Sequence, residues 1–195
     1  YKQEYSEILN IFYGISVTQI KDYITNDILS VAPEPFSILS LSIPKKIDCT
    51  IEDCLDEYTK QEYLIDENQW YNDKTEEKQD VTKNITFWSL PNVLIIELKR
   101  YNNNQQKIHT LVTTPLTDLD LSKYVSGYNS DGYTYDLFGT GNHSGNVYGD
   151  HYTAYIKNAH YNWYSVNDSL INEISENRVI TAYTYCLVYR QKNKE

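Results

Sequence analysis

Apolar and polar residues alternate along much of this chain with the two-residue period that is typical of β-strands. The runs are short, and glycine, asparagine and proline residues bound them. We predict strands over 36–43, 92–101, 109–114, 133–138, 151–157, 163–166 and 182–189. The stretch 92–101 is apolar on both faces in its first half, which predicts a central strand with 109–114 as its neighbour.

Helical spacing of apolar residues is found in two places. Residues 5–12 predict a short helix near the start of the chain. Thr50 and Asp53 form a Thr-x-x-Asp start signal, and the apolar side chains at 51, 54, 55 and 58 line one face of the helix that follows. This arrangement places Cys54 against a core.

Turns and polar stretches separate these elements. Glu34-Pro35-Phe36 is expected to interrupt regular structure, and 62–83, which is polar and acidic, predicts a solvated β ribbon. Glycine- and asparagine-rich turns are predicted at 127–132 and 139–149. Strands outnumber helices and short turns join them, so we predict an α+β fold with a mostly antiparallel sheet and few helices, in one domain.

Composition narrows the class of partner. The 195 residues include twenty tyrosines, which favour half-buried pleated surfaces, and the formal net charge is −10. Such a charge argues against a nucleic-acid partner and suits a basic protein partner better. No apolar run approaches the ~18 residues that cross a bilayer, and no leader opens the chain. We therefore expect no membrane partner and an intracellular location, either cytoplasmic or nuclear.

The sulfur-containing residues add two expectations. Three cysteines, an odd number without regular spacing, argue against a disulfide framework and for a reducing compartment. The chain contains no methionine, which indicates a trimmed piece of a longer protein or a processed product.

His151 is the strongest candidate for chemistry. It opens a predicted strand in GDHYTAYIKN, although such a histidine taken alone is more often structural. Asn167, in NWYSVNDS, follows sixteen residues later, the separation expected if a strand, a turn and an antiparallel strand bring the two side chains together. An amide carbonyl can fix the ring orientation of a histidine that serves a thiol nucleophile. Asp168 is a candidate to assist or replace Asn167.

Ordered sequence blocks make a family resemblance specific. EPFSILSLSIP, TIEDCLDEYTKQE, FWSLPNVLIIELKR, LKRY, DLDLSKYV, NHSG, GDHYTAYIKN, WYSVNDS and AYTYCLVYR occur in an order similar to that of the ubiquitin-specific proteases (peptidase C19, ubiquitin carboxyl-terminal hydrolases). The resemblance implies a papain-like cysteine protease palm at about 91–190, β-ribbon fingers at about 15–90 and a missing thumb. It also implies hydrolysis of isopeptide or peptide bonds after the C-terminal glycine of ubiquitin, with ubiquitin or ubiquitinated proteins as partners.

The resemblance assigns roles to residues. It makes His151 the catalytic histidine, Asn167 the third triad residue and Asp168 its acidic neighbour. The turn at 139–150 and the segment after Lys99 would border the channel for the ubiquitin tail, although Lys99-Arg100 is more simply interpreted as a strand end that emerges into solvent. The remaining histidines, His109, His143 and His160, are expected to have structural roles.

The cysteine box of the family is missing from these residues. Cys49, Cys54 and Cys186 are better interpreted as buried small hydrophobic residues than as nucleophiles. We therefore expect the nucleophile on a missing N-terminal segment, and we expect the 195-residue chain alone to be inactive.

Two further departures from the family pattern concern the zinc-binding positions and the channel for the ubiquitin tail. Many relatives hold zinc at the fingertips with two Cys-x-x-Cys pairs, but the matching positions here are Tyr23, Asn26, Asn72 and Thr75, so no metal and no cofactor is expected. Asp150 replaces a common glycine before the histidine. Its carboxylate is expected either to raise the pKa of His151 or to narrow the channel.

Three functions remain open at this point. The chain is part of an active deubiquitinase, a catalytically inactive ubiquitin-binding pseudoprotease, or a β-rich interaction module for another protein. Retention of both His151 and Asn167 favours the first, because sequence drift in an inactive protein is not expected to preserve that pair.

Overall fold

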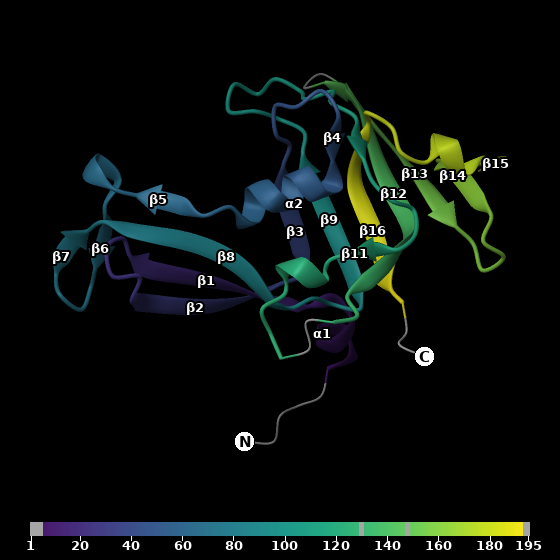
Figure 1. The fold of residues 1–195 in the computed structure, drawn as a ribbon. Helices are drawn as coiled ribbons and strands as arrows, with labels where there is room; N and C mark the ends of the chain where they lie inside the picture. Colours follow the sequence, from purple (N-terminus) through teal and green to yellow (C-terminus); the bar gives the residue numbers. More distant parts are fainter. Residues whose placement is uncertain (1–5, 129–130, 147–148, 193–195) are drawn as a thin grey trace.

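A computed structural model describes residues 6–128, 131–146 and 149–192 of the chain, and the side chain at 146 is not described. Tyr5 of the first predicted helix, residues 129–130 of the first predicted turn and 147–148 of the second lie outside the described residues. Two main sheets are seen side by side, with β1, β2, β5 and β8 extending away from the larger sheet (Figure 1).

The larger sheet has eight strands, in the order β15-β14-β13-β12-β16-β9-β3, with β11 paired to β12. All pairs are antiparallel except β3 with β9. The strands are β3 (Ile38–Ser42), β9 (Val93–Lys99), β11 (Leu119–Asp120), β12 (Thr134–Asn146), β13 (Gly149–Lys157), β14 (Trp163–Asn167), β15 (Leu170–Ile174) and β16 (Thr184–Gln191).

The smaller sheet has four strands in the order β2-β1-β8-β5, all antiparallel. They are β1 (Gly14–Asp22), β2 (Ile28–Phe36), β5 (Glu62–Leu64) and β8 (Val81–Ser89). Two short pairs complete the strands: β6 (Trp70–Asn72) with β7 (Glu77–Gln79), and β4 (Cys49–Thr50) with β10 (Val112–Thr113).

The described chain contains two α-helices and short 3-10 turns. They are α1 (Glu7–Phe12), α2 (Ile51–Thr59), η1 (Asp66–Asn68), η2 (Ser122–Tyr124) and η3 (Glu176–Arg178). The predicted α+β class with a mostly antiparallel sheet and few helices is confirmed.

The core lies between α2 and one face of the larger sheet. Alternate residues of each strand point to this face, so the pattern repeats from β3 to β12. The side chains of Leu41, Leu94 and Ile96 are fully buried, as are Ile51 and Leu55 on the helix. The strands β3 and β9 thus supply buried side chains to the core of the same sheet that carries the candidate site.

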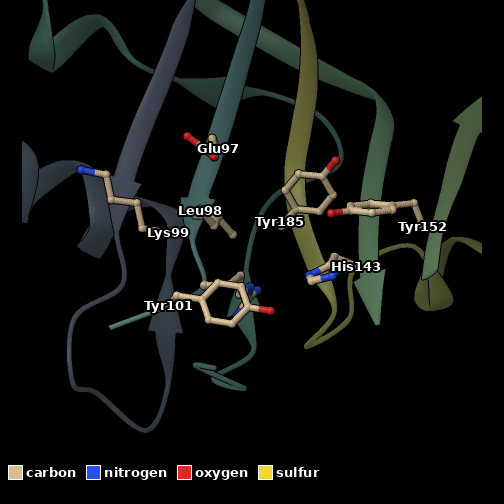
Figure 2. A pocket seen from close by; sticks show the side chains of 8 residues that line it. Glu97, Leu98, Lys99, Tyr101, His143, Tyr152 and Tyr185 are labelled. Atoms are coloured by element: carbon tan, nitrogen blue, oxygen red, sulfur yellow. The ribbon is translucent and has the colours of Figure 1, made fainter. Parts of the chain in front are cut away.

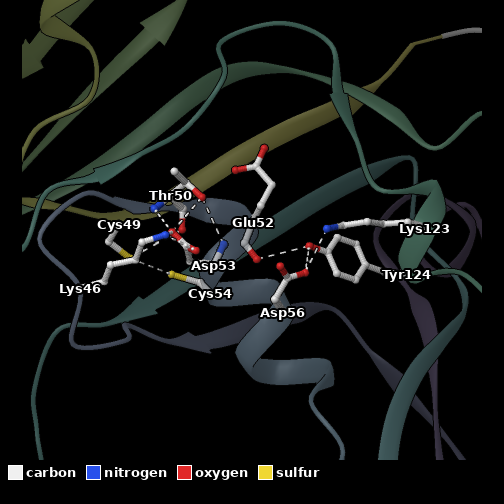
Figure 3. A network of polar contacts seen from close by, with 9 residues as sticks. All are labelled: Lys46, Cys49, Thr50, Glu52, Asp53, Cys54, Asp56, Lys123 and Tyr124. Atoms are coloured by element: carbon white, nitrogen blue, oxygen red, sulfur yellow. Dashed lines mark hydrogen bonds and ion pairs between the residues drawn. The ribbon is translucent and has the colours of Figure 1, made fainter.

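A polar network holds α2 at its N-terminal cap and at its middle (Figure 3). Thr50 and Asp53 form a reciprocal capping box: the Asp53 amide donates to Thr50 Oγ1 at 3.2 Å, and the Thr50 amide donates to Asp53 Oδ2 at 2.8 Å. Further along, Tyr124 Oη donates to Asp56 Oδ1 at 2.6 Å. The capping box confirms the predicted start of this helix.

Three predictions about elements are wrong. Residues 109–114 do not form a neighbour of β9, whose partners are β16 and β3; only β10 is a strand there, and it pairs with β4. Residues 139–146 are strand rather than turn, because they continue β12 against β13. Glu34-Pro35-Phe36 does not interrupt regular structure, because β2 is an edge strand, where proline leaves no ladder hydrogen bond unmade.

The four positions that match zinc ligands in relatives make other contacts. The ring of Tyr23 packs edge-on against Tyr63 at 6.1 Å between centroids. Asn72 is buried, its Nδ2 donates to Gln79 Oε1 at 2.9 Å, and its Oδ1 accepts from the Lys74 amide at 3.0 Å. Thr75 donates its amide to the Asn72 carbonyl, and Asn26 adopts a left-handed turn conformation.

The three thiols lie in apolar surroundings. Cys49 and Cys54 are buried in the core, with 3.9 Å between their Sγ atoms. Burial, reinforced by the neighbouring Cys49, raises the pKa of Cys54 to about 12. Burial also raises the pKa of Cys49 and, together with Glu97, that of Cys186. Cys186 is half-buried, not fully buried as expected. In all three cases burial disfavours the thiolate form.

The capping box gives a first prediction. Thr50→Ala removes the side chain that accepts the Asp53 amide and should lower the free energy of unfolding by about 1 kcal/mol, measured by urea denaturation. Thr113→Ala is the matched control, because Thr113 is exposed and no hydrogen bond of its hydroxyl is found within the described residues. Equal losses in the two variants would contradict the role of the cap.

The buried thiols give a second prediction. In the folded chain at pH 8, Cys54 should react with a disulfide reagent at least about 100-fold more slowly than a free thiol, since so little thiolate is present. The same chain unfolded in guanidinium is the control, and there all three thiols should react quickly. A single fast thiol in the folded chain would contradict the assignment.

Candidate active site

The register of two adjacent strands brings His151 and Asn167 to one face of the larger sheet. Ala154 of β13 lies opposite Val166 of β14. Continuing this register by one residue places Asn167 opposite Thr153, and His151 lies two residues earlier on the same face. Diagonal neighbours of this kind are within reach of longer side chains.

The two side chains are in hydrogen-bond contact. His151 Nε2 lies 2.7 Å from Asn167 Oδ1. The amide oxygen can only accept, so Nε2 carries the proton and Nδ1 has the free lone pair in the neutral ring. His151 is exposed, and Nδ1 has no hydrogen-bond partner among the residues that the structure describes. The ring is thus oriented on one side and open to a proton donor on the other.

Asp168 follows directly in the turn between β14 and β15. Its φ of 52° is left-handed, a conformation that aspartate tolerates in tight turns. The residue is exposed, and within the described chain no hydrogen bond joins its carboxylate to His151. The geometry therefore brings Asn167, rather than Asp168, into contact with the imidazole.

Asp150 faces a different histidine from the one expected. Its Oδ1 lies 2.8 Å from Nε2 of His143, whereas His151 points to the other face of β13. Neighbouring residues in a strand point to opposite faces, so a carboxylate at 150 is directed away from the imidazole at 151. The suggestion that Asp150 acts directly on His151 is not supported by this contact.

His143 is buried and connects several groups. Its ring stacks on Tyr152 with 4.7 Å between centroids and a 20° interplanar angle. Lys107 Nζ lies 3.3 Å from His143 Nδ1 and donates to the carbonyls of His143 at 3.0 Å and Gly145 at 3.2 Å. His143 therefore contacts groups from two other segments, through Lys107 after β9 and through Asp150 and Tyr152 in β13, whereas the sequence predicted only a structural role.

A cleft of about 370 Å³ opens beside this cluster, on the sheet face opposite the core. Figure 2 shows Tyr101, Tyr152, Tyr185 and His143 converging on it from separate segments, with Glu97 and Lys99 higher on β9. Burial raises the pKa of Tyr185, so its hydroxyl stays protonated near neutral pH. The cleft thus offers aromatic faces and hydrogen-bonding groups on the face opposite the side chain of His151, and Tyr152, which follows His151 in β13, is one of its lining residues.

Arg100 does not emerge into solvent as predicted. It is 4% exposed, and its Nε and Nη2 donate to the Thr184 carbonyl at 2.9 and 2.6 Å. Nη1 donates to the carbonyls of Ile108 and Thr110. A buried guanidinium can be stabilised by carbonyl dipoles when its donors are all used, and here it ties the segment after β9 to the start of β16.

Sequence reasoning missed Lys107, Tyr152 and Tyr185. A signal existed for Tyr152, since residues 150 and 152 share a strand face opposite His151. No sequence pattern indicated that Lys107 contacts residues 143–145, because that contact joins segments thirty-six residues apart.

The described residues contain neither a metal-binding cluster nor a membrane-spanning helix. No group of three or more histidine, cysteine, aspartate or glutamate side chains there could hold a metal ion. No helix in that part of the chain has the length and apolarity needed to cross a membrane.

Comparisons with known proteins identify a family. The family model described as ubiquitin carboxyl-terminal hydrolase matches residues 1–189. Ubiquitin carboxyl-terminal hydrolase 12 of Saccharomyces cerevisiae is 39% identical over 163 residues, which cover 80% of this chain and 13% of that protein. Ubiquitin carboxyl-terminal hydrolase 15 of Homo sapiens is 36% identical over 154 residues, which cover 77% of this chain and 16% of that protein. The chain thus spans a small part of these relatives.

Among solved structures, the SAGA Ubp8/Sgf11/Sus1/Sgf73 DUB module bound to ubiquitin aldehyde contains a chain of similar fold. The TM-score is 0.83 and the identity 27%, and the match covers all of this chain and 44% of that one. A family model over nearly the whole chain, together with relatives of this identity, establishes the relationship. The chain belongs to the ubiquitin carboxyl-terminal hydrolase family.

Proposed function

We propose that this chain supplies the histidine and its orienting partner to a thiol-dependent deubiquitinase. The observation that carries the proposal is the 2.7 Å contact between His151 Nε2 and Asn167 Oδ1, on a chain of this family. The nucleophilic cysteine would lie on a segment N-terminal to these residues, because burial raises the pKa of all three thiols here and so disfavours their thiolates.

The chemistry follows from the orientation of the imidazole. Nδ1 of His151 takes the proton of the incoming thiol, and the thiolate sulfur attacks the carbonyl carbon of the C-terminal glycine of ubiquitin. The imidazolium then protonates the leaving amine as the carbon–nitrogen bond breaks, and water hydrolyses the thioester. Asn167 holds the ring in position through both steps, and Asp168 supplies a negative field beside the imidazolium without contacting it.

The arrangement of the sheets suggests a division of labour. We assign a fingers-like role to about 15–90 and a papain-like palm to about 91–190, although β3 and α2 of the first range pack within the larger sheet. Ubiquitin or ubiquitinated proteins are the proposed partners. The net charge of −10 suits a basic partner surface rather than nucleic acid, and the free thiols suit a reducing cytoplasmic or nuclear compartment.

A ubiquitin derivative with a C-terminal electrophile tests the main proposal. The product of the whole gene should form a covalent adduct, whereas the 195-residue chain alone should not, because it has no reactive thiolate. No adduct with a folded whole-gene product that still binds ubiquitin would favour the inactive pseudoprotease. No binding at all would favour an interaction module for another protein.

Substitution of the orienting residue gives a third prediction. In the whole-gene product, Asn167→Ala should lower kcat for a ubiquitin substrate by about 100-fold, because the freed ring no longer presents Nδ1 to the thiol. Asn167→Asp keeps an acceptor and should retain most of the activity. Asn172→Ala changes an exposed asparagine of β15 and is the matched control. Unchanged kcat in Asn167→Ala would contradict the assigned role.

A further inference from the structure

We propose that Lys107, His143 and Asp150 form a charged relay that positions His151 by fixing the strand on both sides of it. His143 lies on the sheet face opposite the candidate catalytic pair, yet it contacts both neighbours of His151 in the sequence. The catalytic meaning of the relay depends on the proposed function, whereas its geometry and protonation do not.

The proton positions in the relay follow from the chemistry of its ends. A lysine ammonium can only donate, so Nδ1 of His143, 3.3 Å from Lys107 Nζ, must be the acceptor. A neutral imidazole then carries its proton on Nε2, which donates to Asp150 Oδ1 at 2.8 Å. The three groups therefore form an ordered line from ammonium to imidazole to carboxylate, with a single tautomer of His143.

Lys107 joins two segments that border the cleft. It pairs with Tyr101 across the turn after β9, and its ammonium donates to the carbonyls of His143 and Gly145 near the end of β12. Burial lowers the pKa of Lys107, and the charge of Asp150 opposes that shift. The contacts of His143 with Lys107 on one side and Asp150 on the other link the turn after β9 to the start of β13.

His143 in turn restrains β13 at two points. His143 and Tyr152 are direct partners in the register between β12 and β13, which places their rings in stacking contact. Asp150 is the diagonal neighbour of His143 on the same face. His151 lies between these two anchored residues and points to the other face, where Asn167 holds its ring.

The consequence is a division of roles around one histidine. Asn167 sets the rotation of the His151 ring, and the relay sets the backbone from which the ring projects. A reacting group must be held to within a fraction of an ångström for efficient proton transfer, so the supporting contacts affect rate without touching substrate. Lys107, His143 and Asp150 are therefore positioning residues. A glycine at 150 would leave His143 Nε2 without this acceptor.

Nitrogen-15 spectra of the histidine rings in the 195-residue chain test the relay directly. We expect His143 in the wild-type chain to show protonated Nε2 and unprotonated Nδ1. Lys107→Met should remove that preference between tautomers and broaden the ring signals of His151, because β13 is no longer restrained. Asp150→Ala should have the same effects, and Asp150→Asn, which keeps an acceptor, should restore part of the wild-type spectrum.

Matched variants at a distant ion pair control for loss of charge alone. Lys192→Met and Asp118→Asn each break the surface pair between Lys192 Nζ and Asp118 Oδ1 and should leave all histidine signals unchanged. A protonated Nδ1 on His143 in the wild-type chain would overturn the proposal. So would sharp, unshifted His151 signals in both Lys107→Met and Asp150→Ala, provided that backbone amide spectra show these variants to be folded.

The kinetic part of the test uses the whole-gene product. There, Lys107→Met and Asp150→Ala should each lower kcat about 10-fold with little change in KM, since the affected group is the base rather than the binding surface. An equal fall in kcat for Lys192→Met would count against a positioning role. If the wild-type protein hydrolyses nothing, the proposed function fails, and the ring spectra still decide whether the relay exists.

Discussion

The whole candidate site depends on the register between β13 and β14. A slip of one residue in that pairing would turn either His151 or Asn167 to the opposite face of the sheet, because side chains alternate along a strand. The register is fixed by packing on the same face of β14: Trp163 at the start of the strand is fully buried in the core, so the strand cannot shift without exposing it. A packing constraint at one end of β14 thus determines a hydrogen bond at the other.

Buried or partly buried cations organise the cleft side of this acidic chain. Arg100 binds carbonyls of the segment after β9 and of the start of β16, and Lys107 binds carbonyls near the end of β12. Backbone carbonyls accept these hydrogen bonds without adding a charge, so each cation is held without a carboxylate partner at these contacts. The two side chains connect the segment after β9 to two strands of the larger sheet, β16 and β12.

Local signals in the sequence were sufficient for two contacts between neighbours along the chain, although they missed that 139–146 continue β12 in its hairpin with β13. The two contacts are the capping box of Thr50 and Asp53 and the hairpin that joins His151 to Asn167. Other predictions failed because the partners are distant in the sequence. Arg100 is buried because it donates to the carbonyls of Thr110 and Thr184. Residues 109–114 do not lie beside β9 because β3 and β16 are its partners. A single sequence carries no information about such pairings. The prolines of β2 indicated an interruption of the strand, whereas they lie in an edge strand.

The chemistry of the imidazole also limits where its partner thiol can be. Asn167 occupies Nε2, so only Nδ1 can take a proton, and His151 lies at an exposed part of the sheet. Cys49 and Cys54 lie in the core on the α2 side. Cys186 of β16 lies opposite Glu97 of β9 in the pairing of these two strands. Burial keeps these thiols protonated, whereas a nucleophile must ionise beside the imidazole. The described strands therefore hold the ring of His151 through Nε2 and leave Nδ1 without a hydrogen-bond partner among the described residues.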